Sequence, residues 1–280
     1  MTRPRQATLI GGKGFIGRHL HRRLRAEGWA CWVPERDDAR LMHRDLGHVY
    51  YCAGLTADYA ERPFDTVEAH VALLNRVLRA AHFDSLVYLS STRLYDSLGD
   101  VCATEDAPLA LAPANPRHLY DLSKALGESL CHAAGRGRAR VARLSCVYAG
   151  ASDDGGFLSE LMRRVLACRA AAPPWRIDVE SSPLFARDYV HIDDVLGALT
   201  LIATRGTQTV YNVAGGRNIV NRELFERLFE ASGCEVVARH RHEAPRPPRI
   251  SIQRMAAEFA WQPACVLERL CQATLEPSPC

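Results

Sequence analysis

The sequence predicts a mixed α/β protein built on a doubly wound parallel sheet, followed by a small C-terminal lobe. Short apolar runs alternate with amphipathic segments of helical period over the first part of the chain, an order typical of strands joined by crossover helices. A glycine-rich turn joins the first apolar run to the first amphipathic segment. The pattern loosens after about residue 150, where Pro173-Pro174 and Pro247-Pro248 interrupt it.

The individual elements follow from apolar periodicity. Residues 65–81 place Val67, Val71, Leu74 and Leu78 on one face of a single long helix. Four-residue to five-residue apolar runs indicate buried strands between such helices. We expect strands over 7–10, 30–33, 49–53, 86–90 and 140–144, and further helices over 15–26, 119–133, 157–167, 193–203 and 222–231.

Length and composition limit the kind of protein. The chain has 280 residues, of which 48% are apolar, enough for one large core with an appended lobe. Lys and Arg number 35 against 32 Asp and Glu, a balance that does not indicate a nucleic-acid partner. The 10 cysteines include no CxxC pair, so we expect buried free thiols in a reducing cytoplasm and no bound metal. No signal peptide or membrane-spanning run is evident, which predicts a cytoplasmic protein with no membrane partner.

Three glycines stand where the first strand meets the first helix. Gly11, Gly14 and Gly17 follow a GxxGxxG spacing. Glycines at this joint permit a tight turn and let a pyrophosphate approach backbone N–H groups at the positive end of the helix. The alternative is a merely glycine-rich turn, but its place after the first strand favours a dinucleotide site in a Rossmann-type sheet.

This assignment divides the chain. We expect residues 1–150, with 186–216 returning to them, to form the dinucleotide-binding Rossmann domain. Residues 151–185 and 217–280 are expected to form a small substrate-binding lobe.

The second strand ends near charged residues that bear on cofactor choice. An acid there can hold the ribose hydroxyls of NAD, and a cation can hold the extra phosphate of NADP. Glu35 serves the first role and Arg36 the second, while Lys13 in the glycine loop adds another cation. Two cations favour NADP over NAD, although Arg36 can equally be a solvated loop charge.

A hydroxyl and a Tyr/Lys pair complete a candidate redox site. Tyr120 and Lys124 are four residues apart on a predicted helix and share a face. An ammonium beside a phenol favours the phenolate and lowers its pKa, which makes the phenol usable as a base near neutral pH. Ser91 ends a predicted parallel strand, where its hydroxyl can orient a substrate alcohol or carbonyl.

These residues resemble the extended short-chain dehydrogenase/reductase family, in particular its nucleotide-sugar epimerases, dehydratases and reductases. The resemblance covers nearly the whole chain. It is carried by GGKGFIG, YYCAG, LSSTRLY, YDLSK, RLSCVY, RDYVHIDDV, YNVAGG and FAWQP.

The resemblance implies roles for single residues. Tyr120 would be the acid/base, Lys124 its electrostatic support and ribose clamp, and Ser91 the group that orients the carbonyl. The cofactor would contact Gly11, Lys13, Gly14, Phe15, Ile16, Gly17, Glu35, Arg36, Ala53, Gly54, Tyr120 and Lys124.

Substrate contacts are expected from Thr92, Arg93 and Arg187. A guanidinium matches phosphate oxygens, so Arg187 is a candidate for a substrate diphosphate, the alternative being a pair with Asp188 or Asp193. In the family's dehydratases acidic residues follow the catalytic hydroxyl, whereas Thr92 and Arg93 follow it here, which disfavours elimination chemistry.

Three further departures from the family are evident. His70 stands where a helix usually begins with Asn, and we expect a structural histidine rather than a proton relay. Cys146 replaces a polar residue, and we expect a small buried thiol. Only residues 37–48 separate two strands that usually flank an extra strand and helix, so the adenine side of the site must be simplified.

Our first hypothesis is an NAD(P)-dependent epimerase of a nucleotide-activated sugar that works through a transient keto intermediate. The second is an NADPH-dependent reductase of a keto sugar or another carbonyl compound. A third, of another class, is a non-catalytic protein that senses the cofactor. The resemblance further implies a homodimer.

Overall fold

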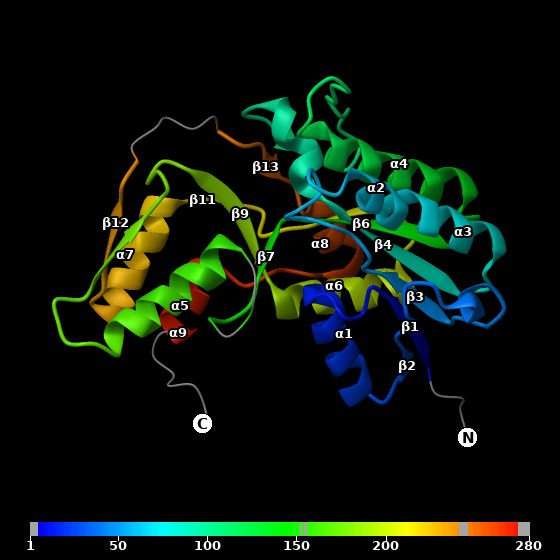
Figure 1. Cartoon of the computed structure of the whole chain (residues 1–280), viewed down its shortest axis with the longest axis horizontal. Helices are drawn as coiled ribbons and strands as arrows, with labels where there is room; N and C mark the ends of the chain where they lie inside the picture. The colour runs from blue at the N-terminus through cyan, green and yellow to red at the C-terminus, as the bar shows by residue number, and fades with distance from the viewer. Residues whose placement is uncertain (1–4, 152, 154–155, 241–245, 274–280) are drawn as a thin grey trace.

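A six-stranded parallel sheet forms the centre of the computed structural model, which describes residues 5–151, 153, 156–240 and 246–273. Its strand order is β10-β6-β4-β3-β1-β2, and every neighbouring pair is parallel (Figure 1). The predicted α/β fold class is therefore confirmed. The strands are β1 (Gln6–Ile10), β2 (Ala30–Trp32), β3 (His48–Tyr51), β4 (Ser85–Ser91), β6 (Ala139–Leu144) and β10 (Val210–Val213).

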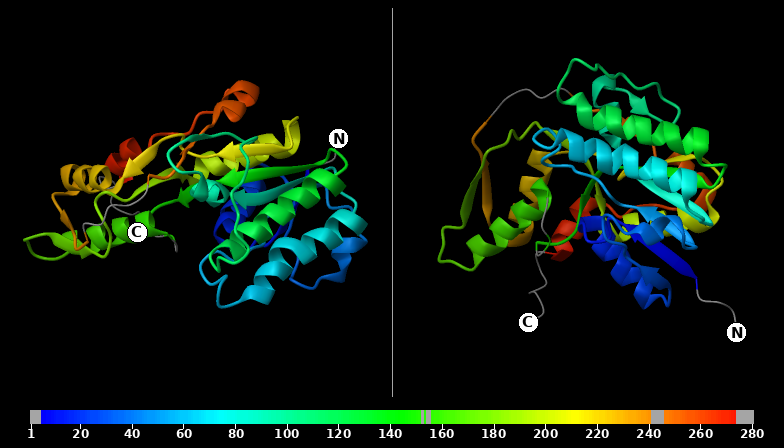
Figure 2. Two further views of the ribbon diagram at one scale, coloured as in Figure 1. Left: turned by 90° about the horizontal axis from the view of Figure 1, so that it is seen from above. Right: turned by 45° about the vertical axis from the view of Figure 1, so that its right-hand side comes forward.

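Helices cover both faces of this sheet. On one face lie α1 (Phe15–Ala26) and α6 (Ile192–Arg205); on the other lie α2 (Pro63–Val67), α3 (Leu73–Ala80) and α4 (His118–Ala134) (Figures 1 and 2). A separate cluster of buried apolar residues fills the space on each face. The buried strands explain why their sequences read as continuous apolar runs rather than as alternating ones.

The long helix expected over 65–81 is interrupted. A π-helical turn, Glu68–Ala72, separates α2 from α3. The wider turn shifts the helical phase, so Val67 is 43% exposed whereas His70 is fully buried. The prediction that Val67 belongs to the buried face is therefore wrong, because it assumed one uninterrupted helical period.

The second group of elements extends to one side of the sheet (Figures 1 and 2). Strand β9 (Ala186–His191) pairs in parallel with β7 (Cys146–Tyr148) and antiparallel with β11 (Asn218–Val220). A third apolar cluster holds this group together. Its other elements are α5 (Phe157–Arg169), β8 (Arg176–Val179), α7 (Asn221–Ser232), β12 (Glu235–Ala238) and α9 (Val266–Ala273).

Some short elements were not expected from the sequence. Helix α8 (Gln253–Phe259) packs on β10 and places Met255 in the core beneath the large sheet. The division into two domains stays a prediction. The remaining elements are η1 (Ala39–Met42), η3 (Thr92–Leu98), β5 (Cys102–Ala103) and β13 (Arg249–Ile250).

Between Arg36 and Val49 the chain forms only the short 3-10 helix η1 before β3 begins. As a result β2 is the edge strand of the large sheet. Among the described residues, no helix is both long and apolar enough to cross a membrane.

A buried ion pair joins α4 to the sheet. Glu128 of α4 and Arg143 of β6 have side chains only 5% and 6% exposed, with Arg143 Nη2 donating to Glu128 Oε2 at 2.6 Å. Ser90 Oγ donates to Glu128 Oε1 at 2.5 Å, and Arg143 Nη1 donates to the Tyr95 hydroxyl at 2.5 Å. Both charges are thereby hydrogen-bonded, the condition for keeping them out of water.

We expect Glu128→Ala to lower the free energy of unfolding by about 3–5 kcal/mol, because it leaves the Arg143 charge buried and unpaired. Replacing both partners together, as Glu128→Leu with Arg143→Met, should restore much of this loss. Glu226→Ala, which removes an exposed pair with Arg222, is the control and should change stability by no more than about 0.5 kcal/mol. Urea unfolding measures the free energy of unfolding of the two single variants and the double variant. Equal losses of stability in Glu128→Ala and Glu226→Ala would contradict the prediction.

Candidate active site

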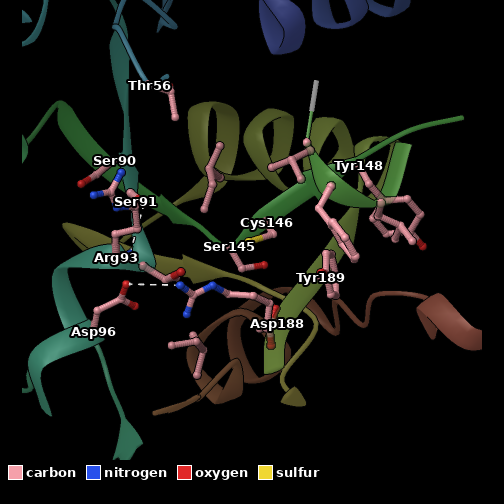
Figure 3. A pocket seen from close by; sticks show the side chains of 18 of the residues that line it. Thr56, Ser90, Ser91, Arg93, Asp96, Ser145, Cys146, Tyr148, Asp188 and Tyr189 are labelled. Atoms are coloured by element: carbon pink, nitrogen blue, oxygen red, sulfur yellow. Dashed lines mark hydrogen bonds and ion pairs between the residues drawn. The ribbon is translucent and has the colours of Figure 1, made fainter. Parts of the chain in front are cut away.

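A cleft of about 660 Å³ lies between the carboxyl ends of the sheet strands and the second group of elements. Figure 3 shows Ser91 and Arg93 at the end of β4 on one side, with Ser145, Cys146 and Tyr189 on the other. Ligands of open α/β sheets bind at this edge. The cleft therefore lies where the sequence places its candidate residues.

The glycine loop leads directly into α1. Gly11 has φ +78°, and a Cβ there would lie 2.5 Å from the Ala53 backbone nitrogen; a Cβ on Gly17 would lie 2.6 Å from the Gly11 carbonyl oxygen. These two glycines are needed to close the turn. Gly14 differs, because a Cβ there would meet only the Gly11 oxygen, at 3.4 Å. The turn itself does not require a glycine at 14, so the open space above it is available to a ligand.

The first turn of α1 has no side-chain cap. Gly14 is the N-cap residue, and the turn contains no acidic residue. Its backbone N–H groups and the positive end of the helix dipole are therefore left uncompensated by the protein. Phe15 and Ile16 of this turn line the cleft.

The residues expected to select between NAD and NADP lie outside the cleft lining. Lys13 Nζ pairs with Glu35 at 2.6 Å, and both side chains are nearly three-quarters exposed. Arg36 is exposed.

Two further cofactor contacts were predicted after β3, at Ala53 and Gly54. Gly54 lines the cleft, where a Cβ would approach Lys124 Nζ to 3.2 Å, whereas Ala53 packs on Gly11.

The structure brings Ser91, Tyr120 and Lys124 together on one wall of the cleft. All three are buried, with 9%, 4% and 5% of their surfaces exposed. Tyr120 and Lys124 lie on the same face of α4, as the four-residue spacing predicts. Ser91 ends β4 and interacts with the Tyr120 hydroxyl.

Lys124 is held in a poorly hydrated position. Its Nζ donates to the Leu89 carbonyl oxygen at 2.8 Å and lies 5.9 Å from the Tyr120 ring centroid. Burial lowers the pKa of Lys124 to about 7, while the negative charge of Glu128 acts in the opposite direction. This lysine therefore changes its charge near neutral pH.

Tyr120 behaves differently from the expectation. Burial raises its pKa above the ordinary value, although hydrogen bonding with Ser91, the Arg93 charge and hydrogen bonding with Thr56 lower it. The prediction that this pKa is lowered is wrong, because dehydration outweighs the Arg93 charge and the two hydrogen bonds. Tyr120 is consequently a protonated phenol at neutral pH and can donate a proton.

His70 has both ring nitrogens committed. The Leu55 backbone N–H donates to Nε2 at 3.2 Å, so Nδ1 carries the proton and donates to Ser123 Oγ at 2.8 Å. The Ser123 hydroxyl in turn donates to the Tyr120 carbonyl oxygen at 2.8 Å. Burial lowers the pKa of His70 to about 3. The geometry supports the structural role and gives no open position for a relay.

Arg187 reaches across the cleft from β9. Its Nη2 lies 4.0 Å from Asp96 Oδ2, and its guanidinium lies 4.6 Å from the Phe185 ring centroid. The counter-ion is Asp96 of η3, rather than either alternative considered from the sequence, Asp188 or Asp193. Arg187, Asp96 and Thr92 all line the cleft, and Figure 3 labels Asp96 on the side of Ser91 and Arg93.

The prediction that Cys146 is a buried residue is wrong, because it is exposed and lines the cleft. The cleft walls nevertheless limit its hydration and raise the pKa of the thiol to about 11. Cys102 is also exposed. Sequence reasoning assigned no cleft position to four residues: Thr56 and Asp96, which lie outside the quoted motifs, and Ser145 and Asp188, which lie within RLSCVY and RDYVHIDDV.

Comparison with known families agrees with the geometry. The sequence model of the NAD dependent epimerase/dehydratase family matches residues 7–214, from β1 to just beyond β10. The chain belongs to this family. The resemblance to extended short-chain dehydrogenases/reductases is confirmed, and the chain is an enzyme of the oxidoreductase type.

Two curated relatives and one solved structure are similar to this family member. A dTDP-6-deoxy-L-talose 4-dehydrogenase (NAD(P)(+)) of Kitasatospora kifunensis is 31% identical over 264 residues, covering 83% of this chain and 80% of the relative. A dTDP-glucose 4,6-dehydratase of Streptomyces griseus is 32% identical over 155 residues, 54% of this chain and only 44% of that protein's length. RMD from Pseudomonas aeruginosa complexed with NADPH superposes with a TM-score of 0.77 at 26% identity, covering 98% of each chain.

We expect Lys124→Met to raise the free energy of unfolding at pH 7 by roughly 1–4 kcal/mol, because it removes a buried amine whose pKa lies near 7 instead of 10.5. The unfolded chain binds the extra proton between these values, so the penalty is complete below pH 7 and fades as pH rises towards 10.5.

Urea unfolding at pH 6.5 and 9.5 measures this difference. Lys13→Met, at the exposed lysine, is the control and should show no comparable pH dependence. A Lys124→Met protein that is less stable than the parent at both pH values would contradict a dehydrated lysine.

Proposed function

We propose that this enzyme reduces the ketone of a nucleotide-activated keto sugar with a nicotinamide dinucleotide. The observation that carries the proposal is the buried, protonated Tyr120 beside Ser91 and Lys124, since a phenol can donate the proton that ketone reduction needs. The dTDP-sugar 4-dehydrogenase relative, which matches most of the chain, supports the substrate class.

The glycine loop fits the cofactor. The uncapped first turn of α1 and the open space above Gly14 would receive its pyrophosphate, and the cleft beside Phe15, Ile16 and Gly54 would receive its nicotinamide end. Lys124 would contact its ribose. When bound, the nicotinamide supplies the hydride.

Side chains of this protein would then orient the ketone and transfer the proton. The Ser91 hydroxyl orients the ketone, and Tyr120 gives its hydroxyl proton to the carbonyl oxygen as the carbon receives the hydride. The product is an alcohol, and the Tyr120 phenolate recovers a proton from solvent. Lys124, which is partly charged near neutral pH, stabilises this phenolate.

Arg187 is proposed to bind the substrate diphosphate from the opposite wall. Its pair with Asp96 is loose at 4.0 Å and its side chain is 32% exposed, so phosphate oxygens can replace the carboxylate. The lobe of 151–185 and 217–280 would close over the sugar from this side.

We propose NADP as the preferred form of the cofactor. The exposed Lys13–Glu35 pair is a weak interaction in water, so Lys13 can still bind a phosphate. Arg36, the residue after Glu35, is exposed and provides a second cation.

A cytoplasmic homodimer also stays a proposal. Exposed apolar side chains on the neighbouring helices α2 and α4, Phe64, Val67 and Leu126, support it.

A second candidate is the epimerase, which the family description favours. It would use the same three residues twice, once to remove and once to restore the hydroxyl proton. Its cofactor would not be consumed and would stay bound through gel filtration.

Gly14→Ala is expected to weaken NADPH binding at least 10-fold while it changes the free energy of unfolding by less than about 1 kcal/mol, because the added methyl enters the pyrophosphate space and little else. Gly17→Ala is the matched control, expected to destabilise the fold because its Cβ would clash with the Gly11 oxygen. Fluorescence titration with NADPH and NADH measures affinity and preference together. Unchanged NADPH affinity in Gly14→Ala would contradict this cofactor site.

Tyr120→Phe is expected to lower kcat for reduction of a dTDP-linked 6-deoxy-4-keto sugar by about 10²–10⁴-fold, since the ring remains but the proton donor is lost. Tyr50→Phe, a buried tyrosine outside the cleft lining, should retain parental activity. Absorbance at 340 nm follows the nucleotide.

Stoichiometric loss of NADPH supports the reductase, and inversion of a nucleotide sugar without net NADPH loss supports the epimerase. Activity that survives Tyr120→Phe would rule out catalysis by this site.

A further inference from the structure

Arg93 lies against the ring of Tyr120. Its guanidinium carbon is 4.5 Å from the Tyr120 ring centroid and 5.3 Å from that of Tyr59. Its Nε lies 3.9 Å from Asp121 Oδ1, and its side chain is only 30% exposed. The two rings and the carboxylate therefore occupy much of its surroundings, and the charge is held beside the phenol.

The position of Arg93 is fixed by the same turn that presents Ser91. Ser91 is the N-cap residue of η3, and the Arg93 backbone N–H donates to its hydroxyl oxygen at 3.2 Å. The Ser91 hydroxyl and the Arg93 guanidinium thus reach Tyr120 from two positions of one turn. A shift of this turn would move both groups together.

Two cations lie near Tyr120, but they differ in chemistry. Lys124 Nζ is 5.9 Å from the ring centroid, and burial lowers the pKa of this lysine to about 7. A guanidinium keeps its charge throughout the working range of an enzyme. Arg93 is therefore the permanent cation at this phenol, whereas the charge on Lys124 depends on pH.

The other described groups around Tyr120 do not supply a permanent positive charge in place of Arg93. Ser91 and Thr56 provide hydrogen bonds, while the Asp121 charge raises the pKa of Tyr120. The His70 ring meets Tyr120 edge-on at 5.4 Å and is neutral, because burial lowers its pKa to about 3. The Tyr59 ring lies 5.5 Å from the Tyr120 ring and adds no formal charge at neutral pH.

We propose that Arg93 is a positioning residue that stabilises the Tyr120 phenolate left when the hydroxyl proton passes to the ketone oxygen, and that it is not a ligand of the substrate phosphates. This inference rests on the proposed function. In the complete step, the carbonyl carbon would receive a hydride from bound reduced nicotinamide, Tyr120 would give a proton to the oxygen, and solvent would reprotonate Tyr120 beside Arg93.

A double-mutant cycle on the cofactor-loaded enzyme tests the proposal. Arg93→Met keeps an apolar side chain against the two rings but removes the charge. We expect it to lower kcat about 10–100-fold with KM for the keto sugar changed less than about 3-fold, and Arg93→Lys to recover part of the loss. In a Tyr120→Phe background, Arg93→Met should cause no further loss of kcat, because its effect requires the hydroxyl.

The pH profile gives a second readout. The Arg93 charge lowers the pKa of Tyr120, so its removal should move the basic limb of kcat/KM for reduction to higher pH. Arg79→Met, at an exposed arginine on α3, is the control and should change neither kinetics nor profile. Thermal unfolding of each variant checks folding, and Arg93→Gln takes the place of Arg93→Met if the latter does not fold.

Losses that multiply in the double variant, or a raised KM with an unmoved pH profile, would overturn the proposal and make Arg93 a substrate ligand. Failure of the proposed function would give a different result from failure of the Arg93 role. The parent enzyme would then not reduce the keto sugar, or Tyr120→Phe would be as active as the parent.

Discussion

The contact of α4 with the sheet determines the geometry of the candidate site, and the buried Glu128–Arg143 pair fixes that contact. Tyr120, Lys124 and Glu128 recur at four-residue spacing on one face of α4. The last of them is tied to Arg143 of β6 and to Ser90 of β4. Because Ser91 follows Ser90 directly, the interaction that holds the helix also sets the distance between the serine and tyrosine hydroxyls. The net energy of such a pair is small, but its geometry admits few alternatives.

Burial shifts the pKa values of Tyr120 and Lys124 in opposite directions. It disfavours the charged form of each, so Tyr120 remains a phenol and Lys124 loses its proton readily. The electrostatic support of a phenolate therefore cannot come from Lys124 alone over the whole pH range. A permanent cation beside the ring compensates for this, and the chain has Arg93 where the family's dehydratases are expected to have acidic residues.

The opposite side of the cleft, formed by β7 and β9, carries a cation. Arg187 of β9 has a side chain that is 32% exposed and lies 4.0 Å from Asp96 of η3, and the exposed Cys146 of β7 also lines the cleft. A nucleotide-sugar substrate requires both kinds of environment, a dehydrated site for hydride transfer and a cationic site for its diphosphate. The proposed function assigns one wall to each.

Local pattern alone determined much of this protein. Strand and helix order, the glycine turn and the Tyr120/Lys124 spacing were all predictable, because they depend on apolar periodicity and on residues close in sequence. The expected i, i+4 pair and the glycine loop do lie at one edge of the sheet. Only the tertiary structure decided how far each group is dehydrated, which neighbour each charge meets, and where the helical phase changes. The raised pKa of Tyr120, the Arg187–Asp96 pair and the π-helical turn at His70 all depend on contacts between distant segments, which no local pattern encodes.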